Sequence, residues 1–232
     1  MTFVLVLKLA PHLQRKNRKM LLLLYVAIIM ASTGAIIQVV LSFWVSYASL
    51  MLIAAEIPGF FVGVGLIKFF LQNRNVISIN EIGFRTTDIT RTVLIGVVVG
   101  AMLGFSLLSL EHVDFIHTNT NHDIMILEVF ASCCVAPFFE ELLFRGLLFN
   151  FFVRFFGLFQ LAYCQPVKEH GIVVLAAVVS SAMFTFSHLR IPEVLAWIFI
   201  CSLVFTWLYR NTRSLLGSIV AHAVYNFIVI VY

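Results

Sequence analysis

Two carboxylates and an arginine interrupt an otherwise apolar stretch in A-P-F-F-E-E-L-L-F-R-G, residues 136–146. Glu141 and Arg145 are four residues apart, so in a helix they share a face and can pair, which offsets the cost of burying each charge. Glu140 points about 100° away from Glu141 and has no partner of opposite charge in this stretch. A carboxylate without a cationic partner is suited to accept a proton, so the pattern predicts a general base.

Two other apolar stretches carry a histidine at helical spacing. His188 follows Phe184 by one turn, and His222 precedes Asn226 by one turn on a common helix face. Polar groups are costly to bury unless they find partners. We therefore expect three helices to bring these side chains and Glu140 together in one cavity.

The rest of the chain is too apolar for a water-soluble protein. Of its 232 residues, 62% are hydrophobic and 11% are charged, whereas a soluble domain is about half apolar and about a quarter charged. The composition therefore predicts an integral membrane protein surrounded by the lipid bilayer. The formal charge of +4 does not indicate a nucleic-acid partner, because the basic residues are spread between apolar runs instead of forming a patch.

Each helical membrane span needs roughly 20 mostly apolar residues. On this basis the sequence predicts an all-α, polytopic bundle of about seven spans. These predicted spans cover residues 20–40, 48–70, 92–110, 124–150, 172–188, 193–209 and 214–232. Of the 15 Lys and Arg residues, only Arg190 falls on the opposite side from the others, so the positive-inside rule places the N-terminus in the cytoplasm.

Three strings occur in order on separate predicted spans: E-E-x-x-x-R at 140–145, F-x-x-x-H at 184–188 and H-x-x-x-N at 222–226. They resemble the motifs of the CPBP (CAAX-processing and bacteriocin-processing, or Abi) family of intramembrane endopeptidases. The resemblance covers residues 140–226 and extends to the upstream loop 82–85. It implies a CAAX-protease-like helical bundle, in which N-terminal spans and a cytoplasmic loop (1–91) precede a catalytic core (92–232).

The resemblance also implies roles for the matching residues. Glu140 would be the general base, and His188 would help to hold and polarise the attacking water. His222 and Asn226 would donate hydrogen bonds to the oxyanion, a contribution that is usually the largest single catalytic term. The expected reaction is hydrolysis of a peptide bond in a membrane-associated peptide or protein.

Glu141 and Arg145 also match the motifs, and we interpret them as a supporting pair that orients Glu140 and ties its helix to neighbouring helices. The glutamate, the two histidines and Asn226 also offer ligands for a divalent metal such as zinc, and family members have been described as metalloproteases. We do not favour a metal, because Asn is a poor zinc ligand and metal-free hydrolysis accounts for these residues. No cofactor is therefore expected.

Other interpretations stay open at this point. A non-catalytic membrane adaptor or a bacteriocin self-immunity factor would use the same fold to bind a partner. The charged residues of 140–145 would then form a structural ion-pair cluster. A transporter is not favoured, since the chain shows no repeated halves. Glu56, beside Pro58, and Glu128 are assigned to no site.

The compact loops and the lack of a eukaryotic sorting signal favour a bacterial member of the family, located in the cell membrane. A prenylated substrate is not expected for such a member.

One conflict arises from the predicted spans. The span 172–188 runs outward, so it places His188 near the external surface, whereas Glu140 and His222 fall near mid-membrane. A longer fourth span, a late start of the fifth span or an additional helix at 150–165 would resolve the conflict.

Overall fold

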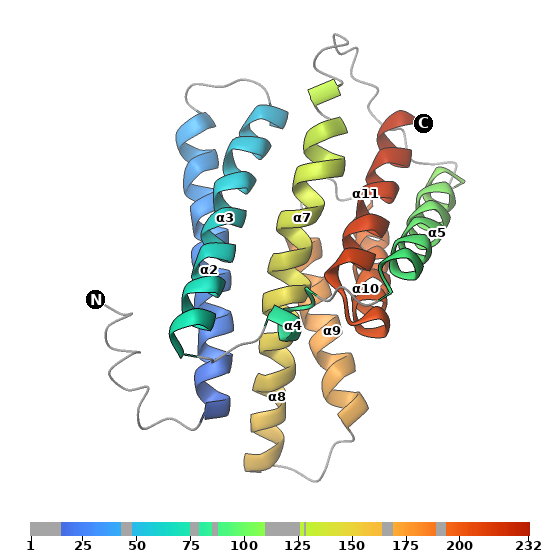
Figure 1. Ribbon diagram of the computed structural model, residues 1–232. Helices are drawn as coiled ribbons and strands as arrows, with labels where there is room; N and C mark the ends of the chain where they lie inside the picture. Colours follow the sequence, from blue (N-terminus) through green and yellow to red (C-terminus); the bar gives the residue numbers. More distant parts are fainter. Residues whose placement is uncertain are drawn as a thin grey trace.

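The computed structural model describes residues 15–42, 48–74, 79–84, 88–109, 126–127, 129–163, 169–188 and 194–232. Within these residues all regular structure is helical (Figure 1). The helices are α2 (Arg15–Ser42), α3 (Ala48–Arg74), α4 (Ile79–Ile82), α5 (Ile89–Leu108), η2 (Ala131–Val135), α7 (Ala136–Glu141), η3 (Leu142–Phe149), α8 (Asn150–Tyr163), α9 (Glu169–Phe186), α10 (Leu195–Thr212) and α11 (Leu215–Val231). The predicted all-α helical membrane bundle is confirmed.

By length and hydropathy, three of the described helices can cross a membrane: Lys19–Val40 within α2, α5 and α9. The apolar helix α11 is shorter. The other predicted spans coincide with α3, with the helix that contains α7, and with α10. The count of seven spans, the cytoplasmic N-terminus and the division at residue 91 stay predictions.

The fourth helical segment is longer than predicted. Instead of the predicted span 124–150, η2, α7, η3 and α8 follow one another without a break from Ala131 to Tyr163, as one long rod in Figure 1. Helix α9 then returns beside α8. At about 1.5 Å per residue, the 18 residues of α9 extend about 27 Å in the direction opposite to α8. This brings the end of α9 to the level of η3, close to Glu140, and removes the conflict in depth.

Close packing between α5 and α11 depends on three glycines spaced four residues apart, Gly96, Gly100 and Gly104. A Cβ atom at Gly96 would lie 2.7 Å from the Gly217 carbonyl oxygen, and one at Gly100 would overlap the Ala221 carbonyl. Small residues at this spacing let two helix backbones approach closely. Helix α11, which carries His222, is therefore held directly against α5.

Replacing Gly100 by Ala is expected to lower the free energy of unfolding by about 1–3 kcal/mol, because the added methyl group overlaps the backbone of α11. Gly65 is the matched control, because a Cβ atom there meets no other atom within 4 Å. Thermal unfolding of the two detergent-solubilised variants measures the difference. Equal stability of Gly100→Ala and Gly65→Ala would contradict the close packing.

Candidate active site

Glu140 faces two imidazole rings that come from other helices. The Nε2 atom of His188, in the turn after α9, lies 4.0 Å from Glu140 Oε1, and the Nε2 atom of His222, in α11, lies 3.8 Å from Glu140 Oε2. The structure therefore brings these three predicted residues together, and the conflict in depth that the predicted span boundaries created does not arise. At such distances a bridging water is the natural hydrogen-bond partner.

The cluster is partly open. The side chain of Glu140 is 15% exposed and that of His188 is 28% exposed, whereas His222 is buried. Glu140 Oε2 has no hydrogen-bond partner among the described residues. The exposed parts of Glu140 and His188 give a small molecule such as water access to the cluster, although the Oε2 atom itself is buried.

His188 is oriented by its own helix end. Its Nδ1 atom lies 2.9 Å from the carbonyl oxygen of Phe184. Because a carbonyl oxygen only accepts, Nδ1 must carry the hydrogen, and in a neutral ring Nε2 then presents its lone pair toward Glu140. The ring also lies against the Phe184 ring, with 4.7 Å between centroids. The F-x-x-x-H spacing therefore places a support for His188 one turn before it.

His222 is held through its other nitrogen. Its Nδ1 atom lies 3.0 Å from Glu141 Oε1, and its ring stacks on Phe205 with 5.1 Å between centroids and an interplanar angle of 22°. A carboxylate accepts, so Nδ1 donates. Glu141 thus fixes the orientation of the ring, and Nε2 is directed toward Glu140.

Glu141 and Arg145 form a salt bridge of 2.8 Å, and both side chains are 0% exposed. The second terminal nitrogen of Arg145 donates to the Ser202 Oγ atom at 2.8 Å and to the Ser202 carbonyl at 3.2 Å. The guanidinium carbon lies 4.5 Å from the ring centroid of Phe184 and 5.5 Å from that of Phe205. The pair thus connects its own helix to α9 and α10.

Helix α7, which carries both glutamates, lies between the two π-helical segments η2 and η3. A π-helical turn contains more residues than an α-helical turn, so it rotates the side chains that follow it, and such turns are frequent at functional sites. Regular α-helical spacing in the sequence gave no indication of these turns.

Asn226 Nδ2 donates to the Ser132 carbonyl oxygen in η2 at 2.7 Å. An amide nitrogen carries two hydrogens, so the second can serve another acceptor. Asn226 therefore connects α11 to the helix of Glu140. Its role toward an oxyanion stays a prediction, as do the roles of the other motif residues.

Several contacts of the site were missed at the sequence level. Ser202, Ser132 and Phe205 hold motif residues, but serine and phenylalanine are common in apolar helices and gave no distinct signal. Glu56 is buried in α3, and Glu128 lies outside the described residues. Among the described residues, no three His, Cys, Asp or Glu side chains are grouped as in a metal site. The absence of a cofactor stays a prediction.

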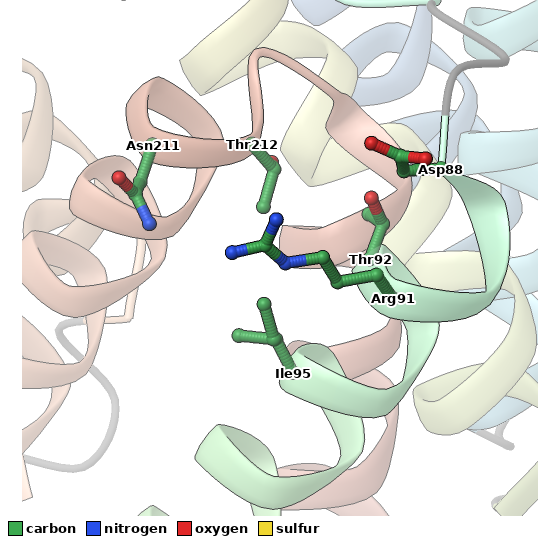
Figure 2. Close-up of a pocket in the computed structure, with 6 residues that line it drawn as sticks. All are labelled: Asp88, Arg91, Thr92, Ile95, Asn211 and Thr212. Carbon is green, nitrogen blue, oxygen red and sulfur yellow. The ribbon is translucent and has the colours of Figure 1, made fainter.

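A pocket of about 170 Å³ lies elsewhere, between the beginning of α5 and the end of α10 (Figure 2). Figure 2 shows the Arg91 guanidinium extending between the two helices. The lining residues are Asp88, Arg91, Thr92, Ile95, Asn211 and Thr212. None of them belongs to the cluster around Glu140, so the pocket and the cluster are separate features.

One family model matches the region of the chain that carries the site. Residues 122–228 match the family model described as type II CAAX prenyl endopeptidase Rce1-like. This range contains all three motifs, and the match confirms the family resemblance. Neither the search of curated proteins nor the search of solved structures found a match.

Replacing Arg145 by Met is expected to cost about 3–5 kcal/mol of unfolding free energy, because it leaves Glu141 buried without a countercharge. The double variant Glu141→Gln/Arg145→Met should recover part of this loss, since it removes both charges. Arg154→Met is the matched control: its salt bridge with Glu81 is partly exposed, so its loss should cost about 1 kcal/mol or less. Equal losses in Arg145→Met and Arg154→Met would contradict the buried pairing.

Proposed function

Because residues 122–228 match the model of the Rce1-like family, which is a protease family, we propose that this membrane protein is an intramembrane endopeptidase that uses Glu140 to activate water. The observation that carries the proposal is the convergence of Glu140 with two imidazole Nε2 atoms from other helices, at distances of 4.0 and 3.8 Å. A water molecule between Glu140 and the His188 Nε2 atom contacts a proton acceptor, the carboxylate, and a second polar group, the imidazole, at the same time.

The first step of the proposed reaction is attack by that water. Glu140 takes one proton from it, and the His188 Nε2 lone pair accepts a hydrogen bond from its other proton. The oxygen forms a bond to the carbon of the scissile peptide, and the carbonyl oxygen becomes an oxyanion. Glu140 is now neutral, and the total charge of the site is unchanged.

The oxyanion requires hydrogen-bond donors. When His222 is an imidazolium, its Nε2 carries a hydrogen, while its Nδ1 hydrogen stays bonded to Glu141 at 3.0 Å. The second Nδ2 hydrogen of Asn226 is the other proposed donor. Glu140 then passes its proton to the leaving amine, and the carbon–nitrogen bond breaks. The site thereby returns to its starting protonation.

The proposed substrate is a membrane-associated peptide or protein, because the carboxylate lies within a helical membrane bundle and is only partly exposed. The family name refers to prenylated C-terminal peptides, whereas the sequence favours a substrate without a prenyl group. These two substrate classes are distinguished with two fluorescence-quenched peptides that end in Cys-aliphatic-aliphatic-X, of which one is farnesylated and the other is not. Both peptides are offered to the full chain in phospholipid vesicles.

Glu140→Gln is expected to lower the cleavage rate of whichever peptide is cut by about 10²–10⁴-fold, because Gln keeps the shape of the side chain but cannot accept the proton. Glu169→Gln is the matched control, since it makes the same chemical change at an exposed position at the beginning of α9. Both variants are compared at equal membrane abundance. Undiminished cleavage by Glu140→Gln would reject the proposal and favour a binding protein.

A metal chelator such as 1,10-phenanthroline is expected to leave the cleavage rate within about twofold of its starting value, because every proposed step uses side chains of this chain. The hydrolysis rate is measured before and after treatment and after addition of zinc. Loss of activity that zinc restores would show that the two histidines and Glu140 act as ligands instead.

A further inference from the structure

Glu56 is a buried acid that the proposed reaction does not use. It lies inside α3, where the residue is 7% exposed, and its Oε2 atom has no hydrogen-bond partner among the described residues. A carboxylate at such a position is unstable unless a cation or hydrogen-bond donors compensate for its lost hydration. The presence of this buried carboxyl group in an apolar helix therefore requires a chemical explanation.

The face of α3 that carries Glu56 packs against the helix of Glu140. A Cβ atom at Gly59, one turn after Glu56, would lie 2.7 Å from Cε2 of Phe139. The rings of Phe60 and Phe138 also meet edge to face, with centroids 6.3 Å apart. Residues three and four positions apart share a helix face, so Glu56 lies on the side of α3 that faces α7.

No described cation compensates for Glu56. The elements packed against α3 are α2, η2 and α7. Glu140, on α7, is a carboxylate of the same sign as Glu56. On α2, Lys19 is paired with Glu81. The other titratable side chains described on those three elements are Tyr25 of α2, Cys133 and Cys134 of η2, and Glu141 of α7, which is paired with Arg145.

Two carboxylates on packed helix faces with no cation between them repel each other, so a neutral form of one of them is favoured. The two members of this pair differ in their surroundings. Glu140 faces His222, which stabilises a negative charge when its ring is an imidazolium, whereas no described cation pairs with Glu56 and its Oε2 atom has no hydrogen-bond partner among the described residues. The neutral acid is therefore better placed at Glu56.

We propose that Glu56 is an additional positioning residue of the active site: it stays a neutral carboxylic acid and leaves the single negative charge of the pair on Glu140, where the base is needed. This inference rests on the proposed function of Glu140. When Glu56 loses its proton, a second buried anion opposes the oxyanion, and the cleavage rate falls.

The test is infrared spectroscopy of the purified full chain in vesicles, which separates the carbonyl stretch of a protonated carboxylic acid from the bands of carboxylates. At neutral pH, wild type should show a protonated-acid band that Glu56→Gln loses and that Glu140→Gln and the control Glu169→Gln keep. A wild-type spectrum that Glu56→Gln leaves unchanged in this region would overturn the proposal. This readout does not depend on cleavage, so it stays decisive if the proposed protease function fails.

The pH profile of kcat/KM for the cleaved peptide gives the second readout, because a merely structural role of Glu56 would not shift it. Glu56→Gln cannot ionise, so the midpoint of the alkaline limb should rise by about one pH unit or more relative to wild type. Glu169→Gln should leave this midpoint in place. An alkaline limb that Glu56→Gln does not move would overturn the link between the proton on Glu56 and catalysis.

Discussion

The guanidinium of Arg145 lies where no solvent reaches it, and the surrounding helices are arranged to compensate for its lost hydration. Glu141 supplies the countercharge, Ser202 supplies two oxygen acceptors, and the faces of Phe184 and Phe205 cover the group. Each of these groups also fixes something else. Glu141 holds His222, and Phe184 supports His188. A single buried charge thus orients both histidines of the candidate site.

Adjacent glutamates serve two different purposes because neighbouring positions of a helix point about 100° apart. Glu141 is committed to Arg145 and His222 inside the bundle. Glu140 is left with imidazole nitrogens at 3.8–4.0 Å, a distance that suits a shared water. Glu141, which is paired, fixes the positions of the neighbouring side chains, and Glu140, which is not, is the proposed reactive group. Glu56 is buried without a described cation, and it is the residue proposed to stay neutral beside Glu140.

The sequence predicted the helical bundle and the residues that would meet, because charged side chains in apolar helices at one-turn spacing are rare and specific. It misjudged the depth of His188, since apolar runs do not show that α7 and α8 form one long helix against which α9 turns back. The π-helical turns and the supporting contacts of Ser202 and Ser132 leave no distinct pattern in sequence. These features depend on contacts between residues that are far apart in the sequence, so no local sequence pattern indicates them.

The claim that Glu140 and His188 act on one water is tested most directly by a double-mutant cycle of kcat/KM with Glu140→Gln, His188→Gln and the combined variant. Two groups that share a single reacting water act as a unit, so losing the second costs little once the first is gone. We expect the double variant to be no more than about threefold slower than the slower single variant. Losses that multiply would contradict the shared water and would show that the two side chains contribute independently.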